Sequence, residues 1–142
     1  MADHFAVRVG VRSYEIDVNG HVNHANYHRY AEHARTEHMN AAGCSIDRFT
    51  ENGLGIVLLE TTCRFQRELR YGDEVEIDSR LSFGEGRTFR MEHTLRRVSD
   101  DVAAAEITCT MGLLDAAARR LVADPGTRLR ELATAPELLD PV

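Results

Sequence analysis

Five strand-like segments and a single long helical segment constrain the fold of this 142-residue chain. Apolar residues alternate with polar ones, or cluster, at about residues 7–14, 56–65, 75–83, 89–96 and 103–113. Only the segment from Asn26 to about Ala42 carries apolar residues at helical spacing. One helix cannot cover both faces of a five-stranded sheet, so the pattern predicts an α+β fold in which an antiparallel sheet wraps around the helix.

Several local features follow from the same patterns. The opening residues of the second strand, from Ile56 to Leu59, are all apolar, which indicates burial on both faces. The residues from Asp47 to Gly55 are expected to form a loop, and Gly43 is expected to end the helix. Seven residues are predicted on the buried helix face: Tyr27, Tyr30, Ala31, Ala34, His38, Ala41 and Ala42.

Length and composition predict one domain over residues 1–142, with a core at about 5–115 and a tail with a short helix at about 127–135. The net charge of −6 disfavours a nucleic-acid surface. We expect neither a signal peptide nor a membrane span, because no apolar stretch suits either. Three cysteines without metal-ligand spacing point to reduced thiols and a cytoplasmic location.

The segment from Asp17 to Tyr27 combines a carboxylate, a Gly/Asn turn and the start of the helix. A carboxylate can activate water or attack a carbonyl directly, and the first N–H groups of a helix can hold an oxyanion. Asp17 beside Asn19-Gly20 is also an ordinary turn residue, so the chemistry depends on the whole spacing. The motif therefore supplies the parts of an active site at the helix start.

These residues resemble the hotdog fold, specifically the 4-hydroxybenzoyl-CoA thioesterase-like branch. The likeness covers roughly residues 7–115 and rests on four stretches: Val11–Asp17, Gly20–Tyr27, Tyr30–Arg35, and Arg64–Arg67 with Tyr71–Asp73. The chain is similar to bacterial single-domain enzymes that hydrolyse long-chain or miscellaneous acyl-CoAs. Glu68 follows Arg67 where that family usually has proline.

The resemblance implies that Asp17 is the catalytic acid, that the His24 backbone N–H polarises the thioester carbonyl, and that Tyr27 packs beneath the helix. No metal or organic cofactor is implied. The matched motif also places Gly20, Val22, Asn23 and Tyr27 at the substrate.

Other charged residues are candidates from chemistry alone. Glu60 could orient water across a dimer interface, or simply form a salt bridge. Arg64 and Arg67 could meet CoA phosphates, because arginine binds phosphate through two parallel N–H bonds; solvated strand residues are the ordinary alternative. Arg35 is expected to pair with a carboxylate.

The predicted function is therefore hydrolysis of acyl-CoA by a homodimer or homotetramer with shared sites. Two alternatives stay open: a hotdog protein that binds acyl-CoA without chemistry, and an enoyl hydratase or dehydratase using an Asp–His pair such as Asp17 with His21. The acyl chain, the carrier (CoA or acyl carrier protein) and the role of Asp17 as base or nucleophile are left undecided by the residues.

Overall fold

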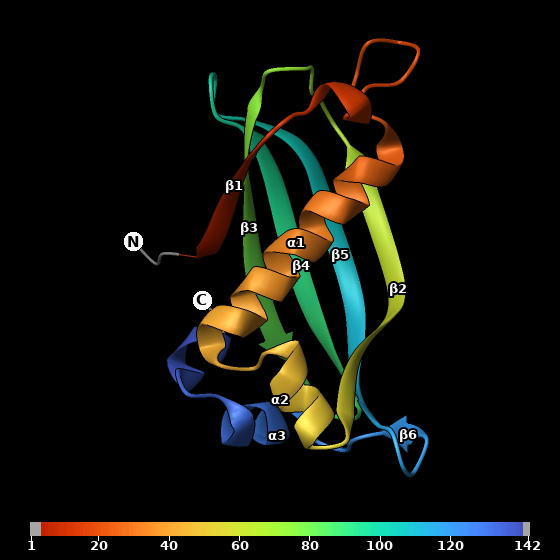
Figure 1. Cartoon of the computed structure of the whole chain (residues 1–142), viewed down its shortest axis with the longest axis vertical. Helices are drawn as coiled ribbons and strands as arrows, with labels where there is room; N and C mark the ends of the chain where they lie inside the picture. The colour runs from red at the N-terminus through yellow and green to blue at the C-terminus, as the bar shows by residue number, and fades with distance from the viewer. Residues whose placement is uncertain (1–3, 141–142) are drawn as a thin grey trace.

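The computed structural model describes residues 4–140. Its main layer is a curled antiparallel sheet with one long helix on one face (Figure 1). The elements are β1 (Phe5–Gly10), η1 (Ser13–Glu15), α1 (His24–Ala42), α2 (Ile46–Glu51), β2 (Leu54–Phe65), β3 (Glu74–Phe83), β4 (Thr88–Arg97), β5 (Val102–Asp115), β6 (Arg120–Leu121), α3 (Pro125–Leu132) and η2 (Pro136–Leu139).

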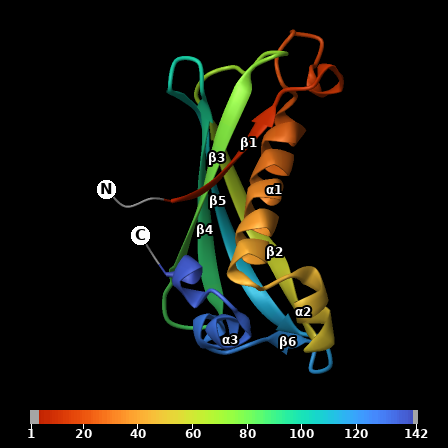
Figure 2. The same ribbon diagram turned by 60° about the vertical axis from the view of Figure 1, so that its left-hand side comes forward.

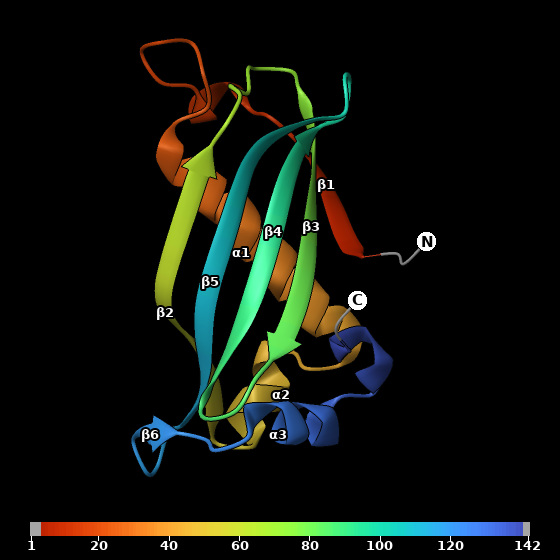
Figure 3. The ribbon, with the colours of Figure 1, turned by 180° about the vertical axis from the view of Figure 1, so that it is seen from behind.

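The strand order in the sheet is β1-β3-β4-β5-β2, and the two-residue β6 extends it by pairing with β5. All of these pairs are antiparallel. The predicted α+β class and the sheet curled around one helix are therefore confirmed. No helix of the described chain covers the back of the sheet (Figure 3). The strands present polar residues there, such as Arg90 and Glu92 on β4.

Helix α1 begins and ends at the signals that its sequence carries. The Asn23 side chain caps it by accepting the Ala25 N–H at 2.9 Å, and Gly43 ends it with a left-handed φ of 89°. The buried face is close to the predicted one, with three differences. Ala41 is exposed, whereas Asn26 and Met39 are buried in addition to the predicted residues.

Three boundaries differ from the sequence predictions. The first strand ends at Gly10 rather than near Tyr14, because residues 13–15 turn in a 3₁₀ helix. The predicted loop at 47–55 contains helix α2. The tail helix spans Pro125–Leu132, so it begins earlier and ends earlier than 127–135; proline at its first position suits a helix start.

Burial of β2 on both faces is a wrong prediction. The strand lies at the edge of the sheet, where Leu58 and Leu59 are 46% and 49% exposed. A register shift between Leu58 and Glu60 marks a bulge at this point. A run of four apolar residues cannot distinguish a central strand from an edge strand that a second molecule covers.

The C-terminal segment closes one end of the molecule, where α3 and η2 pack beside the end of α1 (Figure 2). His38 of α1 holds this segment: its Nε2–H donates to the Leu138 carbonyl at 2.7 Å. Its Nδ1 accepts the Ser79 hydroxyl at 2.8 Å. Among residues 4–140, no helix combines the length and the hydropathy that crossing a bilayer requires.

Candidate active site

Asp17 stands on a small hairpin that presents its carboxylate beside the start of α1. The Asp17 N–H donates to the His21 carbonyl at 2.8 Å, and the Gly20 N–H donates to the Asp17 carbonyl at 3.0 Å. Gly20 has a φ of 79°, which this tight turn requires. One carboxylate oxygen, Oδ1, accepts the Asn19 N–H at 2.9 Å. The turn thus orients the carboxylate and leaves Oδ2 for a substrate or water.

The first turn of α1 leaves one main-chain donor available. Asn23 occupies two of the early N–H groups: its side chain accepts from Ala25, and its carbonyl accepts from Asn26 at 2.9 Å. The His24 N–H has no hydrogen-bond partner in the described part of the chain. This N–H lies at the positive end of a 19-residue helix, where it can bind a developing negative charge.

A buried network, which the sequence patterns did not reveal, fixes the hairpin to the helix. Glu15 is only 6% exposed, and its Oε1 accepts the Tyr30 hydroxyl and the Arg12 N–H, both at 2.8 Å. The Glu15 carbonyl accepts the Asn23 N–H at 2.8 Å and the Asn26 side chain at 3.2 Å. The sequence feature that could have indicated this network is the presence of two polar residues, Asn26 and Tyr30, on the inner face of the helix.

The predicted site residues Asp17, Val22, His24, Tyr27 and Arg67 meet around one hollow of about 360 Å³. Gly20 and Asn23 shape its edge through the turn and the helix cap. Four further residues line the hollow: His21, Phe65, Gln66 and Glu68.

Glu60 and Arg64 do not join this hollow. Phe65 packs edge-on against Tyr27 with ring centroids 5.0 Å apart, and the Thr61 hydroxyl lies 3.7 Å from the Cys109 sulfur beneath the helix. Because side chains alternate along a strand, Glu60 and Arg64 point to the back of the sheet. Arg64 lines a separate hollow there with Arg80 and Glu92.

Burial and neighbouring groups set the ionisation of side chains in the hollow and beside it. Burial raises the pKa of the Tyr27 hydroxyl, with the Leu69 backbone hydrogen bond opposing it, so Tyr27 stays neutral. Burial, together with Cys109, raises the pKa of the Cys63 thiol to about 11, which makes it a poor nucleophile. A hydrogen bond to its own backbone, with Arg70 nearby, lowers the pKa of Glu68. The hollow therefore holds an ionised carboxylate, that of Glu68, at the position where proline was expected.

The helix histidines do not form a metal site. His24 and His33 are exposed, whereas His38 is buried and engaged with Ser79 and Leu138. Within residues 4–140, no group of three or more histidine, cysteine or acidic side chains is arranged to hold a metal ion.

Comparison with known proteins identifies the family. The sequence matches the thioesterase-like superfamily over residues 11–139, which includes the hairpin, the helix and every strand of the sheet after β1. The chain belongs to this superfamily. The resemblance to hotdog thioesterases drawn from the Asp17–Tyr27 motif is therefore confirmed.

Individual relatives agree. An Aquifex aeolicus protein named putative esterase is 33% identical over 102 residues, covering 72% of this chain and 78% of its own length. A chloroplast acyl-acyl carrier protein thioesterase of Arabidopsis thaliana, ATL3, is 34% identical over 82 residues, which is 58% of this chain and 43% of that protein. The solved structure of SAV2348 from Staphylococcus aureus in complex with CoA shares the fold, with a TM-score of 0.81 and 21% identity over 92% of this chain and 84% of that one.

Proposed function

We propose that this member of the thioesterase-like superfamily hydrolyses acyl-CoA thioesters to the free acid and CoA. One observation carries the proposal: the Asp17 carboxylate and the unpartnered His24 N–H line the same hollow of the described chain. Thioester hydrolysis needs a base or nucleophile and a donor for the oxyanion, and these two groups supply them. The superfamily match and the thioesterase relative support the same reaction.

In this mechanism the thioester carbonyl oxygen accepts the His24 N–H. Asp17 takes a proton from a water molecule, whose oxygen attacks the carbonyl carbon. The helix start stabilises the resulting oxyanion, and the intermediate collapses by breaking the carbon–sulfur bond. The departing thiolate then receives the proton from Asp17. In the nucleophilic alternative, an Asp17 oxygen attacks first and water opens the mixed anhydride.

The remaining residues of the hollow have supporting roles in this proposal. Val22 and Tyr27 form the apolar wall against which the acyl group packs. Arg67 is free to meet a phosphate, because the one hydrogen bond of its side chain to a described residue goes to the Gln66 carbonyl at 2.9 Å. Gly20 and Asn23 keep the hairpin and the helix start in register. We assign no role to Glu60 or Arg64 in the chemistry of their own chain.

Asp17→Asn tests the reaction. The amide keeps the shape of the side chain but cannot accept a proton, so we expect kcat/KM for thiol release from acyl-CoAs to fall by ~100-fold or more. Asp47→Asn, on the exposed side of α2, is the matched control and should retain full activity. Full activity in a folded Asp17→Asn variant would remove Asp17 from the mechanism.

The same assay separates the alternatives. Tight binding of acyl-CoA without thiol release would indicate a binding protein, whereas a change in enoyl absorbance without thiol release would indicate a hydratase. The SAV2348 complex favours CoA as carrier, and the ATL3 relative favours acyl carrier protein, so both carriers belong in the panel. We choose CoA because Arg67 lies free at the rim of the hollow.

We further propose that the active form is a homodimer in the cytoplasm, built by pairing of the β2 edge strands. The exposed Leu58 and Leu59 on that edge support this assembly, and so does Phe65, which is 52% exposed beside the hollow. The polar back of the sheet favours a dimer over a tetramer built by stacking sheets. The three free cysteines agree with a reducing compartment.

A further inference from the structure

A wedge-shaped groove follows the seam between α1 and β2. Helix α1 crosses the sheet diagonally, beginning close to the end of β2 and finishing over β3, so the two elements diverge (Figure 1). Three hollows occupy the seam. The first contains Asp17; the second, of about 150 Å³, is lined by His28, Arg29, Leu58 and Thr61 among others. The third, of about 360 Å³, reaches α2.

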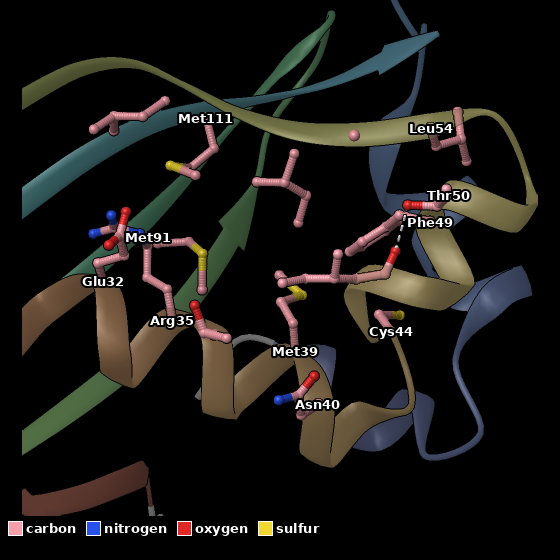
Figure 4. Close-up of a pocket in the computed structure, with 15 residues that line it drawn as sticks. Glu32, Arg35, Met39, Asn40, Cys44, Phe49, Thr50, Leu54, Met91 and Met111 are labelled. Atoms are coloured by element: carbon pink, nitrogen blue, oxygen red, sulfur yellow. Dashed lines mark hydrogen bonds between the residues drawn. The ribbon is translucent and has the colours of Figure 1, made fainter. Parts of the chain in front are cut away.

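The third hollow is suited to an apolar chain. Three methionine side chains, Met39, Met91 and Met111, point into it from α1 and from the sheet floor (Figure 4). Phe49 of α2 and Ile56 of β2 complete the apolar wall. Thioether side chains adapt to irregular ligands, and a mostly apolar lining is typical of sites that bind acyl chains.

Arg35 stands between the second and the third hollow. It lines both the second and the third hollow, as do Glu32 and Leu58. Its Nη1 donates to the sulfur of Cys109 at 3.2 Å, and Cys109 is fully buried on β5. The side chain therefore bridges from the helix to the floor of the sheet. In Figure 4, Glu32 and Arg35 stand at one end of the third hollow.

The partners of Arg35 make this barrier unusual. Among the residues that the structure describes, Cys109 is the one hydrogen-bond partner of the Arg35 side chain, and no carboxylate lies within ion-pairing distance of it. The expected carboxylate pairing of Arg35 is therefore wrong. A half-buried guanidinium needs polar contacts for its five N–H donors. An apolar chain that pushed past it would remove water from these donors without replacing it.

We propose that Arg35 is a specificity-determining residue that stops the acyl chain and restricts the substrate to acyl groups of medium length. The inference rests on the proposed thioesterase function. His24 and Arg35 are 11 residues apart in α1, which corresponds to roughly 16 Å along the axis. The side chain of Arg35 leans toward the helix start, so the usable length is shorter. The third hollow lies beyond the stop.

The test is the chain-length profile of Arg35→Ala. We expect wild-type kcat/KM to decline beyond decanoyl-CoA. In Arg35→Ala, the ratio of palmitoyl-CoA to octanoyl-CoA kcat/KM should rise at least about tenfold, a gain that two further buried methylenes supply. Glu37→Ala, a charged α1 residue outside all three hollows, is the control and should leave the ratio unchanged. An unchanged ratio in folded Arg35→Ala would overturn the proposal.

A second variant tests whether the gain in Arg35→Ala comes from access to the third hollow. Ile56→Trp fills the third hollow, so it should not alter the wild-type profile but should cancel the gain in Arg35→Ala. If Ile56→Trp alone removes activity on long chains, the chain already passes Arg35 and the proposal is wrong. Arg35→Met, which keeps the length of the side chain, provides the same readout if Arg35→Ala does not fold.

Binding of the product acids separates this proposal from the proposed reaction. If no acyl thioester is hydrolysed, the proposed thioesterase function is wrong. Calorimetry with free fatty acids still tests whether Arg35 limits the length of the bound acyl chain. Decanoic acid should bind both proteins, and palmitic acid should bind Arg35→Ala at least about tenfold more tightly than wild type. Equal palmitic acid affinity in both proteins would overturn the role of Arg35.

Discussion

At the scale of single residues, His93 shows how burial determines protonation. The side chain is fully buried beneath α1, and its Nδ1–H donates to the Asp78 carbonyl at 2.9 Å. Its Nε2 then carries a bare lone pair with no partner in the described part of the chain. Burial, with Arg35 and Arg80 nearby, lowers the pKa of His93 to about 3. The native protein therefore holds a neutral imidazole at every moderate pH.

This predicts a stability that falls as the solution is acidified. Histidine in the unfolded chain has a pKa near 6.5. Below about pH 6.5, His93 is therefore protonated in the unfolded state but stays neutral in the native state, which favours unfolding. The free energy of unfolding should fall by up to ~1.4 kcal/mol per pH unit from this group between about pH 6 and 4. His93→Gln should flatten the profile measured by urea unfolding, whereas His33→Gln, on the exposed face of α1, should not. Identical slopes for wild type and His93→Gln would contradict the assignment.

At the scale of elements, the end of α1 is tied to the C-terminal segment through Gly43. The Ala42 carbonyl accepts the N–H groups of Thr134 and Ala135, at 2.9 and 3.0 Å. A β-carbon on Gly43 would lie 2.6 Å from the Thr134 backbone nitrogen. The left-handed φ of 89° and this close approach both require glycine. The helix stop is therefore also a packing contact.

Gly43→Ala should consequently be destabilising beyond the usual effect of a helix end. We expect the free energy of unfolding to fall by about 2 kcal/mol or more, because the left-handed conformation alone costs ~1–2 kcal/mol in an L-residue and the contact adds to it. Urea unfolding measures the change. Gly84→Ala is the matched control: a β-carbon added to Gly84 would meet no atom within 4 Å, and its φ lies outside the left-handed region, so the effect should be small. Equal losses in the two variants would exclude the Thr134 contact as the cause.

At the scale of the whole molecule, the open edge of β2 and the seam beside it lie on the same side. Phe65 packs on Tyr27 of the hollow, and Leu58 lines the groove further along. A second copy paired along β2 would cover the exposed leucines and close the groove from outside. Assembly and activity are therefore expected to depend on each other.

Leu59→Lys tests this link, because a lysine on an edge strand opposes pairing between strands. The variant should elute with the mass of one 16.0-kDa chain, whereas wild type should have twice that mass by light scattering. Thioesterase activity should fall with dissociation. Glu85→Lys, in the exposed turn between β3 and β4 and away from the β2 edge, should leave the mass unchanged. A monomeric, active wild type would refute the dimer.

Local patterns were enough to predict much of this protein. The fold class follows from alternation in the strands and one helical period, because each reports which face of an element is buried. The local geometry of the candidate site was also predictable: Asp17, Gly20, Asn23 and His24 lie in a turn and a helix cap, whose hydrogen bonds join near neighbours in the chain.

Only the tertiary structure decided what depends on strand order and long-range approach. The order β1-β3-β4-β5-β2 puts Ile56–Leu59 on an edge, and the register of β2 against β5 places Glu60 and Arg64 on the face away from Asp17. It also brings Glu68 to the hollow and Cys109 to Arg35, two contacts between residues far apart in the sequence. Alternation specifies which face of a strand is buried, but it carries no information about which strands become neighbours, because every buried strand presents the same pattern.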